Sequence, residues 1–256
     1  MLTIKKLSKT FYPGTEEENK VFQEFSLDFQ ENQCTAILGP NGCGKSTLFN
    51  LISGKIIQDQ GDISLEDFSL SKLNEEDRAK YIGKVNQDPS KGVSPSLTVL
   101  ENMFIARHKG EKFSLKSLVK KNDIEEIKEE LRSLNLNLEN KLNTPVKYLS
   151  GGQRQSLSLL MATLVQPKVL LLDEHTAALD PKTSRLVMEK TSELIESSSM
   201  MTLMITHNLR NAVDFADRVI MLDKGKVIFD LDTKKLSERD LEELYYKNLE
   251  KNYNAA

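Results

Sequence analysis

Cysteine is scarce in this chain, which has 256 residues and only two cysteines, Cys34 and Cys43. Two cysteines at this spacing provide neither a disulfide framework nor a set of metal ligands. We therefore expect the protein to work in a reducing compartment.

Long hydrophobic runs are also missing. The longest ones, such as VLLL at 169–172 and MMTLMI at 200–205, have the length of a strand and are too short to cross a membrane. The N-terminus, MLTIKKLSKTF, lacks the apolar core of a signal peptide. Any action at a membrane is therefore expected to occur through another chain.

An excess of charge of one sign is absent as well, because the net charge is only −3. This balance gives no reason to expect a nucleic-acid partner, and the many lysines are interpreted as a solvated surface. With 39% hydrophobic and 29% charged residues, the composition is that of an ordinary globular protein.

What is present begins with alternating segments typical of strands, LTIKKLSKTF at 2–11 and FQEFSLDFQ at 22–30. The short apolar run CTAIL at 34–38 leads into GPNGCGKST and then into LFNLISGKI, which has helical spacing. This order predicts a strand, a glycine-rich loop and a helix.

From about 90 to 165 the pattern becomes mostly helical. Thr98 and Glu101 have the spacing of a capping box, Asp123 is expected to cap a second helix, and a third is expected at 150–165. This block predicts a helical insertion into an α/β core.

After this block, KVLLLDE and MTLMITHN read as buried strands, each followed by a helical pattern. RVIMLDKGKVIFD predicts a hairpin that turns at Lys224-Gly225, and SERDLEELYYKNLE predicts a last amphipathic helix. No internal repeat is visible, so one copy of an α/β core is expected.

A phosphate-binding loop is predicted at GPNGCGKST, which fits G-x-x-x-x-G-K-[ST] with Gly39, Gly44, Lys45 and Ser46. Its glycines allow the backbone to wrap around phosphate oxygens, and the following helix presents free N–H groups. Lys45 is expected to reach the terminal phosphates and Ser46 to hold Mg²⁺.

Polar residues stand where three predicted strands end. Asp173 suits Mg²⁺ through water, and Glu174, one residue further, can polarise an attacking water. His207 and Gln87 also follow strands. Taken alone, the acids can be solvated, the histidine can be a surface residue, and Gln-Asp-Pro can be an ordinary turn.

A second anion site is predicted at YLSGGQRQSLSLL, because Ser150, Gly151 and Gly152 directly precede a helical run. One small chain would thus carry two phosphate cradles.

These features occur in the order found in the ATP-binding cassette (ABC) ATPases, and the chain resembles that family from its N-terminal strand to about residue 230. The motifs that carry the resemblance are GPNGCGKST, Gln87, LSGGQ, VLLLDE, AALD and THN. It implies an α/β fold: a P-loop NTPase core with an N-terminal antiparallel β subdomain and an inserted α-helical subdomain. The implied boundaries are 1–89 and 166–235 for the core with its β subdomain, 90–165 for the helical subdomain and 236–256 for a C-terminal helix.

The resemblance also implies how the two cradles work together. Two subunits of this family dock head to tail, and each ATP is held by the phosphate loop of one and the LSGGQ motif of the other. Glu174 would polarise the attacking water, and His207 would contact that water and the γ-phosphate. Gln87 would reach Mg²⁺ and couple it to the helical block, and Asp180 would lie at the dimer seam.

Phe11 or Tyr12 would stack on adenine, and the uncertain strand register does not decide between them. The implied catalytic residues are Lys45, Gln87, Glu174 and His207, and the implied Mg²⁺ ligands are Ser46, Gln87 and Asp173. The implied ATP-binding residues are Phe11, Tyr12, Gly39, Pro40, Asn41, Gly42, Cys43, Gly44, Lys45, Ser46, Thr47, Ser150, Gly151, Gly152, Gln153 and Asp180.

One ATPase core without a membrane span implies a homodimer bound to separate permease chains, peripheral to the cytoplasmic face of the cell membrane, as in bacterial uptake systems. Segments such as RAKYIGKVNQDP and LMITHNLRNAV look like the ATPases of bacterial importers whose binding proteins are lipoproteins. Some of these are linked to tyrosine and tryptophan, which implies an amino-acid importer that depends indirectly on an extracytoplasmic lipoprotein.

The nearest alternative is the ATPase of an exporter or of a lipoprotein-release system. A soluble ABC ATPase of DNA repair would need long coiled coils, paired zinc-type cysteines or a basic surface, and none is visible. Translation-associated members carry two cores in one chain.

Two residues depart from the family pattern. His175 stands where the family usually has proline after the catalytic glutamate, and Cys43 occupies a small-residue position that suits either packing or a redox-sensitive thiol. The helix after Thr98 is expected to form, with the Gln87 segment, a groove for a permease helix, with Val99, Met103 or Phe104 partly exposed. The alternative for each of these three residues is a place in the core.

Overall fold

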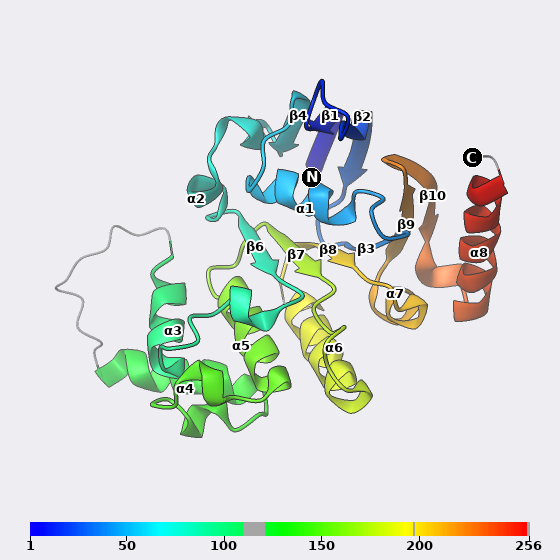
Figure 1. The fold of residues 1–256 in the computed structure, drawn as a ribbon. Helices are drawn as coiled ribbons and strands as arrows, with labels where there is room; N and C mark the ends of the chain where they lie inside the picture. The colour runs from blue at the N-terminus through cyan, green and yellow to red at the C-terminus, as the bar shows by residue number, and fades with distance from the viewer. Residues whose placement is uncertain (110–120, 197, 255–256) are drawn as a thin grey trace. The chain divides into compact units, whose positions relative to one another are not determined.

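The structure is a computed structural model that describes residues 1–109, 121–196 and 198–254 (Figure 1). The chain divides into two compact units, one of Met1–Arg78 with Met201–Ala256 and the other of Ala79–Met200. The subdomain boundaries expected from the sequence remain a prediction, and residues 110–120, 197 and 255–256 within them lie outside the described residues.

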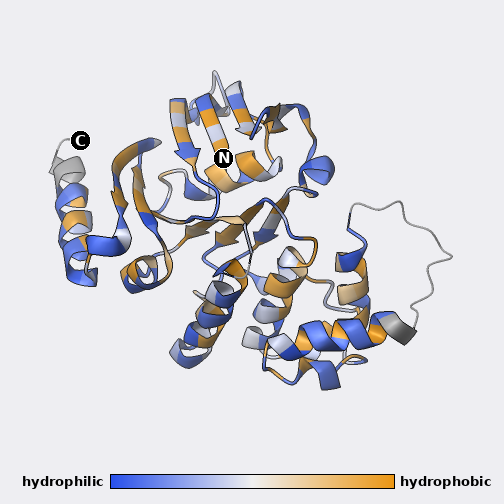
Figure 2. Cartoon of the chain, turned by 180° about the vertical axis from the view of Figure 1, so that it is seen from behind, coloured by the Kyte–Doolittle hydropathy of each residue, from blue (hydrophilic) through white to orange (hydrophobic). Residues whose placement is uncertain are grey.

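The first unit contains an antiparallel sheet with the strand order β2-β1-β4-β5. Hydrophobic and hydrophilic residues alternate along its strands, as Figure 2 shows, so that Phe22, Phe25 and Phe29 of β2 are buried between exposed neighbours. Phe25 and Phe29 keep the strand period of two, whereas Phe22 and Phe25 are three apart because the register of β1 and β2 shifts between them. The antiparallel pairing of β1 with β2 confirms the strands predicted at the N-terminus. The strands are β1 (Leu2–Phe11), β2 (Asn19–Phe29), β4 (Gln60–Leu65) and β5 (Phe68–Ser69).

The same unit also contains parallel strands, because β3 pairs in parallel with β8 on one side and with β9 on the other. Strand β10 pairs antiparallel with β9. Every residue of β3 and β8 is buried, as expected for strands covered on both faces. The predicted turn at Lys224 and Gly225 is confirmed, because both have positive φ (45° and 71°). The strands are β3 (Cys34–Leu38), β8 (Met201–Ile205), β9 (Arg218–Asp223) and β10 (Lys226–Asp232).

The helices of the first unit include the one predicted after the glycine-rich loop. It ends at Gly54, whose φ of 82° is the left-handed C-cap conformation that favours glycine. The helices are α1 (Lys45–Ser53), α2 (Glu75–Arg78), α7 (Leu209–Phe215) and α8 (Glu238–Asn254), with short 3₁₀ turns η1 (Leu70–Lys72) and η5 (Thr233–Lys235).

The second unit contains a parallel pair of strands and most of the long helices. Its elements are β6 (Ile82–Val85), β7 (Val169–Asp173), α3 (Val99–Arg107), α4 (Lys121–Ser133), α5 (Gly151–Thr163) and α6 (Pro181–Glu196), with 3₁₀ turns η2 (Pro89–Lys91), η3 (Leu138–Asn140) and η4 (Val146–Tyr148). The capping box of Thr98 and Glu101 is confirmed at the start of α3.

Helices α3, α4 and α5 share one hydrophobic core, which decides between the two alternatives for Val99, Met103 and Phe104. Val99 and Met103 are fully buried in this core against Ile127 and Leu131, so they cannot line an exposed groove. Phe104 alone of the three is partly exposed. Asp123 is not an N-cap, because α4 begins at Lys121 and Asp123 lies in its first turn, where its charge favours the helix N-terminus.

Candidate active site

The glycine-rich loop joins the end of β3 to the start of α1, and its shape requires glycine at both ends. A Cβ on Gly39 would lie 2.1 Å from the Leu222 carbonyl oxygen, and one on Gly44 would lie 2.9 Å from Cζ of Phe22. Both have positive φ, 145° and 111°. Around a Cβ on Gly42, by contrast, no heavy atom among the described residues lies within 4 Å. The loop backbone is thus exposed at Gly42, where an anion could approach it.

Lys45 places its ammonium over this loop. The side chain is 5% exposed, and Nζ donates hydrogen bonds to the carbonyl oxygens of Gly39 (2.7 Å) and Pro40 (2.9 Å). Ser46 is exposed at the next position, and Thr47 is half-buried. A cation and the free N–H groups of the first turn of α1 therefore surround the loop, as anion binding requires.

Cys43 is buried beneath the loop, with its Sγ 3.9 Å from Nζ of Lys45. Burial raises the pKa of the Cys43 thiol, and the nearby Lys45 charge offsets this only in part. Since the thiolate is the reactive form, the structure favours the packing interpretation over the redox-sensitive one.

The hairpin of β9 and β10 supports the glycine-rich loop. The sequence did not predict this support. The N–H of Gly225 donates to the Cys43 carbonyl oxygen at 3.2 Å. A Cβ on Gly225 would lie 2.0 Å from the Val21 carbonyl oxygen. The turn glycine itself was visible in the sequence, but its contact with a loop 182 residues earlier was not.

His207 lies at the same sheet edge as the phosphate loop. Strands β3 and β8 run parallel with Ile37 opposite Ile205, so their carboxyl ends coincide. The exposed His207 is held between Thr206, whose N–H donates to the Ile37 carbonyl (3.4 Å), and Asn208, which caps α7. The first unit thus brings His207 and the loop of Lys45 to one edge.

Phe11 and Tyr12 both present accessible rings. Phe11 ends β1 and is partly exposed, with Nζ of Lys9 5.6 Å from its ring centroid. Tyr12 follows with φ of 52° and is 64% exposed. The choice between them as the adenine-stacking ring stays open.

In the second unit, Gln87 and Glu174 are in contact. Strands β6 and β7 pair in parallel with Val85 opposite Leu172, so the residues that follow them meet at one edge. Nε2 of Gln87 donates to Oε2 of Glu174 at 3.1 Å. Asp173 is the last residue of β7 and is half-buried, and Glu174 has a left-handed backbone with φ of 45°.

His175 is 2% exposed, and its Nε2 lies 3.2 Å from Oγ1 of Thr191 on α6. Burial lowers the pKa of His175 from 6.5 to about 4, so the ring is neutral near pH 7. Nothing in the sequence pointed to this contact.

The second predicted cradle is a capped helix N-terminus. Ser150 is exposed, its Oγ accepts from the N–H of Gln153 (3.2 Å), and Oε1 of Gln153 accepts from the N–H of Ser150 (3.3 Å). Gly151 and Gly152 form the first turn, where the α-helix supplies no partner for N–H groups. A Cβ on Gly152 would lie 2.2 Å from Cγ2 of Thr183, so α6 requires glycine there.

Asp180 begins α6 as its N-terminal cap. Its Oδ1 accepts from the N–H of Thr183 at 3.1 Å, and hydrogen bonds from Thr183 lower the pKa of this exposed carboxyl. Asp180 is therefore ionised at neutral pH and oriented by α6.

The predicted Mg²⁺ ligands supply a hydroxyl, an amide and a carboxylate oxygen, the hard donors that Mg²⁺ prefers. Ser46 belongs to the first unit, and Gln87 and Asp173 belong to the second. Among residues 1–109, 121–196 and 198–254, no group of three His, Cys, Asp or Glu side chains is placed to hold a metal. This donor set suits an ion that keeps waters and phosphate oxygens as its other ligands.

A buried strand, a glycine loop, a lysine and a helix N-terminus define a P-loop nucleotide-binding protein of the α/β class. The family model described as "ABC transporter" matches residues 22–177. The chain belongs to this family and is an ABC-type ATPase, which binds and hydrolyses ATP.

Curated relatives support this assignment along most of the chain. A tyrosine transport ATP-binding protein of Clostridioides difficile is 46% identical over 249 residues, covering 96% of this chain and 98% of that protein. A xylose/arabinose import ATP-binding protein of Sulfolobus acidocaldarius is 35% identical over 225 residues, covering 88% of this chain and 86% of that protein.

Solved structures agree with the fold. The ATP-binding cassette MJ0796, in a dimeric post-hydrolysis state bound to ADP and Pi, has a TM-score of 0.78 and 27% sequence identity. That match covers 92% of this chain and all 100% of that one. The predicted fold class is thus confirmed. No helix in the described part of this chain has the length and apolar character needed to span a membrane.

Proposed function

We propose that this ATPase is the motor subunit of an importer, working as a homodimer bound to separate permease chains at the cytoplasmic face of the cell membrane. The observation that carries this is the 46% identity, over nearly the whole chain, to a protein named for tyrosine transport. Other relatives are named for import of xylose or arabinose and of phosphonates. The proposed substrate class is an aromatic amino acid, delivered by an extracytoplasmic lipoprotein.

Transport itself tests the substrate. The protein is purified with its copurifying permease and reconstituted into vesicles with a candidate binding protein. We expect ATP-dependent uptake of tyrosine or tryptophan and no uptake of xylose or phosphonate. ATP-driven movement of lipid or lipoprotein outward would instead establish the exporter alternative.

In the proposed dimer, the two cradles serve the same ATP. The loop from Gly39 to Ser46 of one subunit holds the phosphates, and the capped helix that begins at Ser150 of the other approaches the γ-phosphate. This use fits an exposed Ser150 and a first turn made of glycines, which allow close backbone approach. A dimeric solved neighbour with ADP and Pi supports it.

Within that site each residue has a proposed part. Lys45 neutralises phosphate charge, Glu174 accepts the proton of the attacking water, and His207 contacts that water and the γ-phosphate. Ser46, Gln87 and Asp173 would hold Mg²⁺, which would supply further charge neutralisation. Gln87 already contacts Glu174, so it can relay the state of the phosphate to the helical block.

Hydrolysis is tested at Glu174. Glu174→Gln removes the base but keeps the shape, and it should lower the rate of ATP hydrolysis by about 10²–10⁴-fold while ATP still binds. Wild-type turnover by this variant would refute the proposed role.

Dimerisation is tested in the Glu174→Gln background, where bound ATP is not consumed. Adding Ser150→Arg places a bulky side chain at the second cradle, so nucleotide-dependent dimerisation measured by light scattering should be lost. Binding of ATP to the monomer should remain, because the Lys45 loop is untouched. Equal dimerisation with and without Ser150→Arg would mean that LSGGQ does not complete a shared site.

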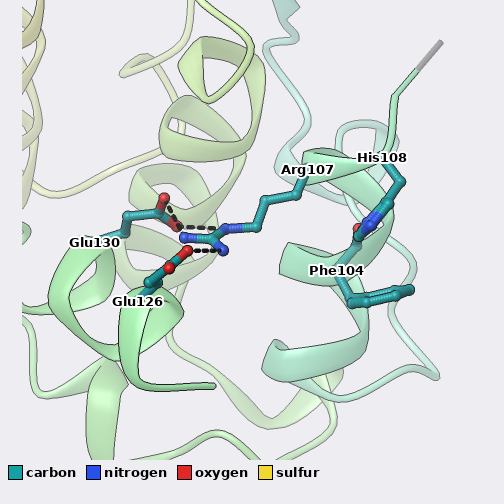
Figure 3. A network of polar contacts seen from close by, with 5 residues as sticks. All are labelled: Phe104, Arg107, His108, Glu126 and Glu130. Atoms are coloured by element: carbon teal, nitrogen blue, oxygen red, sulfur yellow. Dashed lines mark hydrogen bonds and ion pairs between the residues drawn. The ribbon is translucent and has the colours of Figure 1, made fainter. Parts of the chain in front are cut away.

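We place the permease contact on the exposed side of α3, where Phe104 is partly exposed and Ile105 is 49% exposed. Figure 3 shows Phe104 of α3 beside His108, the residue that follows α3, with Arg107 directed between two carboxylates of α4. Arg107 bonds to Glu126 (2.9 Å) and to Glu130 (2.7 Å). A cavity of about 320 Å³ at this place is lined by Phe104, Arg107, His108, Asp123, Glu130 and Leu164.

Crosslinking tests this surface, and the two native cysteines do not interfere because both are buried. Ile105→Cys should crosslink to the permease in the purified complex. Tyr246→Cys on α8, where the native side chain is 55% exposed, is the matched control. Crosslinks from α8 alone would contradict the proposed contact.

A further inference from the structure

His175 is a buried titratable residue that the proposed hydrolysis does not use, although it directly follows Glu174. Its Nε2 lies 3.2 Å from Oγ1 of Thr191. The Thr191 hydroxyl donates its own hydrogen to the Val187 carbonyl oxygen at 2.7 Å. A hydroxyl has one hydrogen, so Thr191 can only accept from His175, and the Nε2–H of His175 is the donor.

The backbone of Glu174 needs such support. Its φ of 45° is left-handed, a conformation that costs a non-glycine residue about 1–3 kcal/mol and persists only where the surroundings fix it. The N–H of Ala177 donates to the Glu174 carbonyl at 2.9 Å, and Asp180 is fixed to the start of α6. The hydrogen bond between His175 and Thr191 connects the loop from Glu174 to Asp180 with the middle of α6. This connection is made by the residue that directly follows Glu174.

We propose that His175 is a positioning residue for Glu174, because its bond to Thr191 anchors the loop to α6 and so fixes the direction of the carboxylate. This inference rests on the proposed role of Glu174 as the base. Proline, which is usual at this position in the family, restrains a loop through its ring. In this chain the side-chain bond performs that restraint.

Steady-state ATP hydrolysis by the full chain tests the inference through two matched pairs of variants. His175→Leu and Thr191→Val remove the bond while nearly keeping volume, and each should lower kcat about tenfold, because a small misplacement of a reacting group is costly. The KM for ATP should change by less than about twofold, since ground-state binding is untouched. His175→Gln and Thr191→Ser keep a donor and an acceptor and should recover most of kcat.

Two further comparisons separate positioning from a general structural role. The double variant His175→Leu/Thr191→Val should be no slower than either single one, because both remove one bond. In the Glu174→Gln background, His175→Leu should cause no additional loss. Thermal unfolding of each variant shows that the assayed protein is folded.

The outcomes are distinct. If kcat is unchanged in His175→Leu, with or without a lowered melting temperature, the inference is overturned and the role of Glu174 stays intact. The same conclusion follows if His175→Leu causes an added loss of activity in the Glu174→Gln background. Wild-type hydrolysis by Glu174→Gln itself would overturn the proposed base and, with it, the inference.

Discussion

Replacing Arg78 by methionine should strongly destabilise the unit that carries the phosphate loop. Arg78 is 1% exposed and lies at the C-terminus of α1, the helix that begins with Lys45. Its Nη1 donates to the carbonyl oxygens of Leu51 (2.6 Å) and Ile52 (3.1 Å), and its Nε donates to that of Leu73 (3.1 Å). A cation at this point also meets the negative end of the helix dipole.

The magnitude follows from what methionine leaves behind. A hydrogen bond to a charged group contributes about 1.5–3 kcal/mol, but the three bonds of Arg78 share one desolvation cost, so they do not simply add. Burial indeed lowers the pKa of Arg78, with Asp62 acting in the opposite direction. The Leu51 carbonyl keeps a second donor, the N–H of Gly54 at 3.3 Å. Methionine leaves neutral carbonyl oxygens without this donor, at about 1–3 kcal/mol for each buried acceptor that stays unsatisfied, so we expect a loss of about 2–4 kcal/mol.

Urea unfolding of the full chain, followed by circular dichroism, measures this loss against Arg239→Met, whose native side chain on α8 is 86% exposed. The control should change the free energy of unfolding by less than about 0.5 kcal/mol. Arg78→Lys should fall between the two, because an ammonium keeps the charge without the planar fork. Equal shifts for Arg78→Met and Arg239→Met would refute the capping argument.

Three further predictions concern stability and dimerisation. Burial, and to a smaller extent the charge of Asp217, raise the pKa of the Cys34 thiol to about 12. At a pH below this value but above the ordinary thiol pKa, the folded chain therefore keeps a proton that the unfolded chain loses. Stability should therefore fall by up to about 1.4 kcal/mol per pH unit above about pH 9, and Cys34→Ala should flatten this slope in urea unfolding at several pH values. Met103→Ala should cost about 2–5 kcal/mol in the same assay and Ile105→Ala far less, because only Met103 is a core residue. Gly152→Ala should weaken nucleotide-dependent dimerisation by displacing α5 from α6, and adding Thr183→Ser, which removes the clashing Cγ2, should recover part of it.

The sequence predicted those features that depend on residues close together in the chain. The capping box of Thr98 and Glu101, the turn at Lys224 and Gly225, and the order of strand, loop and helix around Lys45 all have local causes. Hydrogen bonding between neighbours and backbone conformation decide them, so a short window of sequence carries the information.

The sequence left alternatives open where packing between helices decides burial. Val99 and Met103 are apolar residues on a short helix, and such residues suit either a groove or a core. They are buried because α4 and α5 also direct apolar side chains, such as Ile127 and Leu157, at the same place. No pattern within α3 distinguishes these cases.

The contacts missed at the site are long-range for the same reason. Gly225 reaches Cys43, His175 reaches Thr191, and Gln87 reaches Glu174 only once strands and helices have been brought together. Each residue type alone is common in a turn, a core or a loop, so its role becomes visible only with its partner.

At the LSGGQ motif, the structure separates a residue whose hydrogen bonds are already made from residues whose N–H groups the helix leaves unsatisfied. Gln153 was expected to hold the γ-phosphate, but its Oε1 closes the capping box and its Nε2 donates to the Leu136 carbonyl at 3.1 Å. Its N–H is likewise taken by Oγ of Ser150. A phosphate that approached Gln153 would have to displace these bonds, whereas the N–H groups of Gly151 and Gly152 lie in the first turn, which the helix leaves unsatisfied. We therefore propose that Gln153 holds the start of the helix in shape and that, in the proposed dimer, the N–H groups of Gly151 and Gly152 are the ones that face the anion.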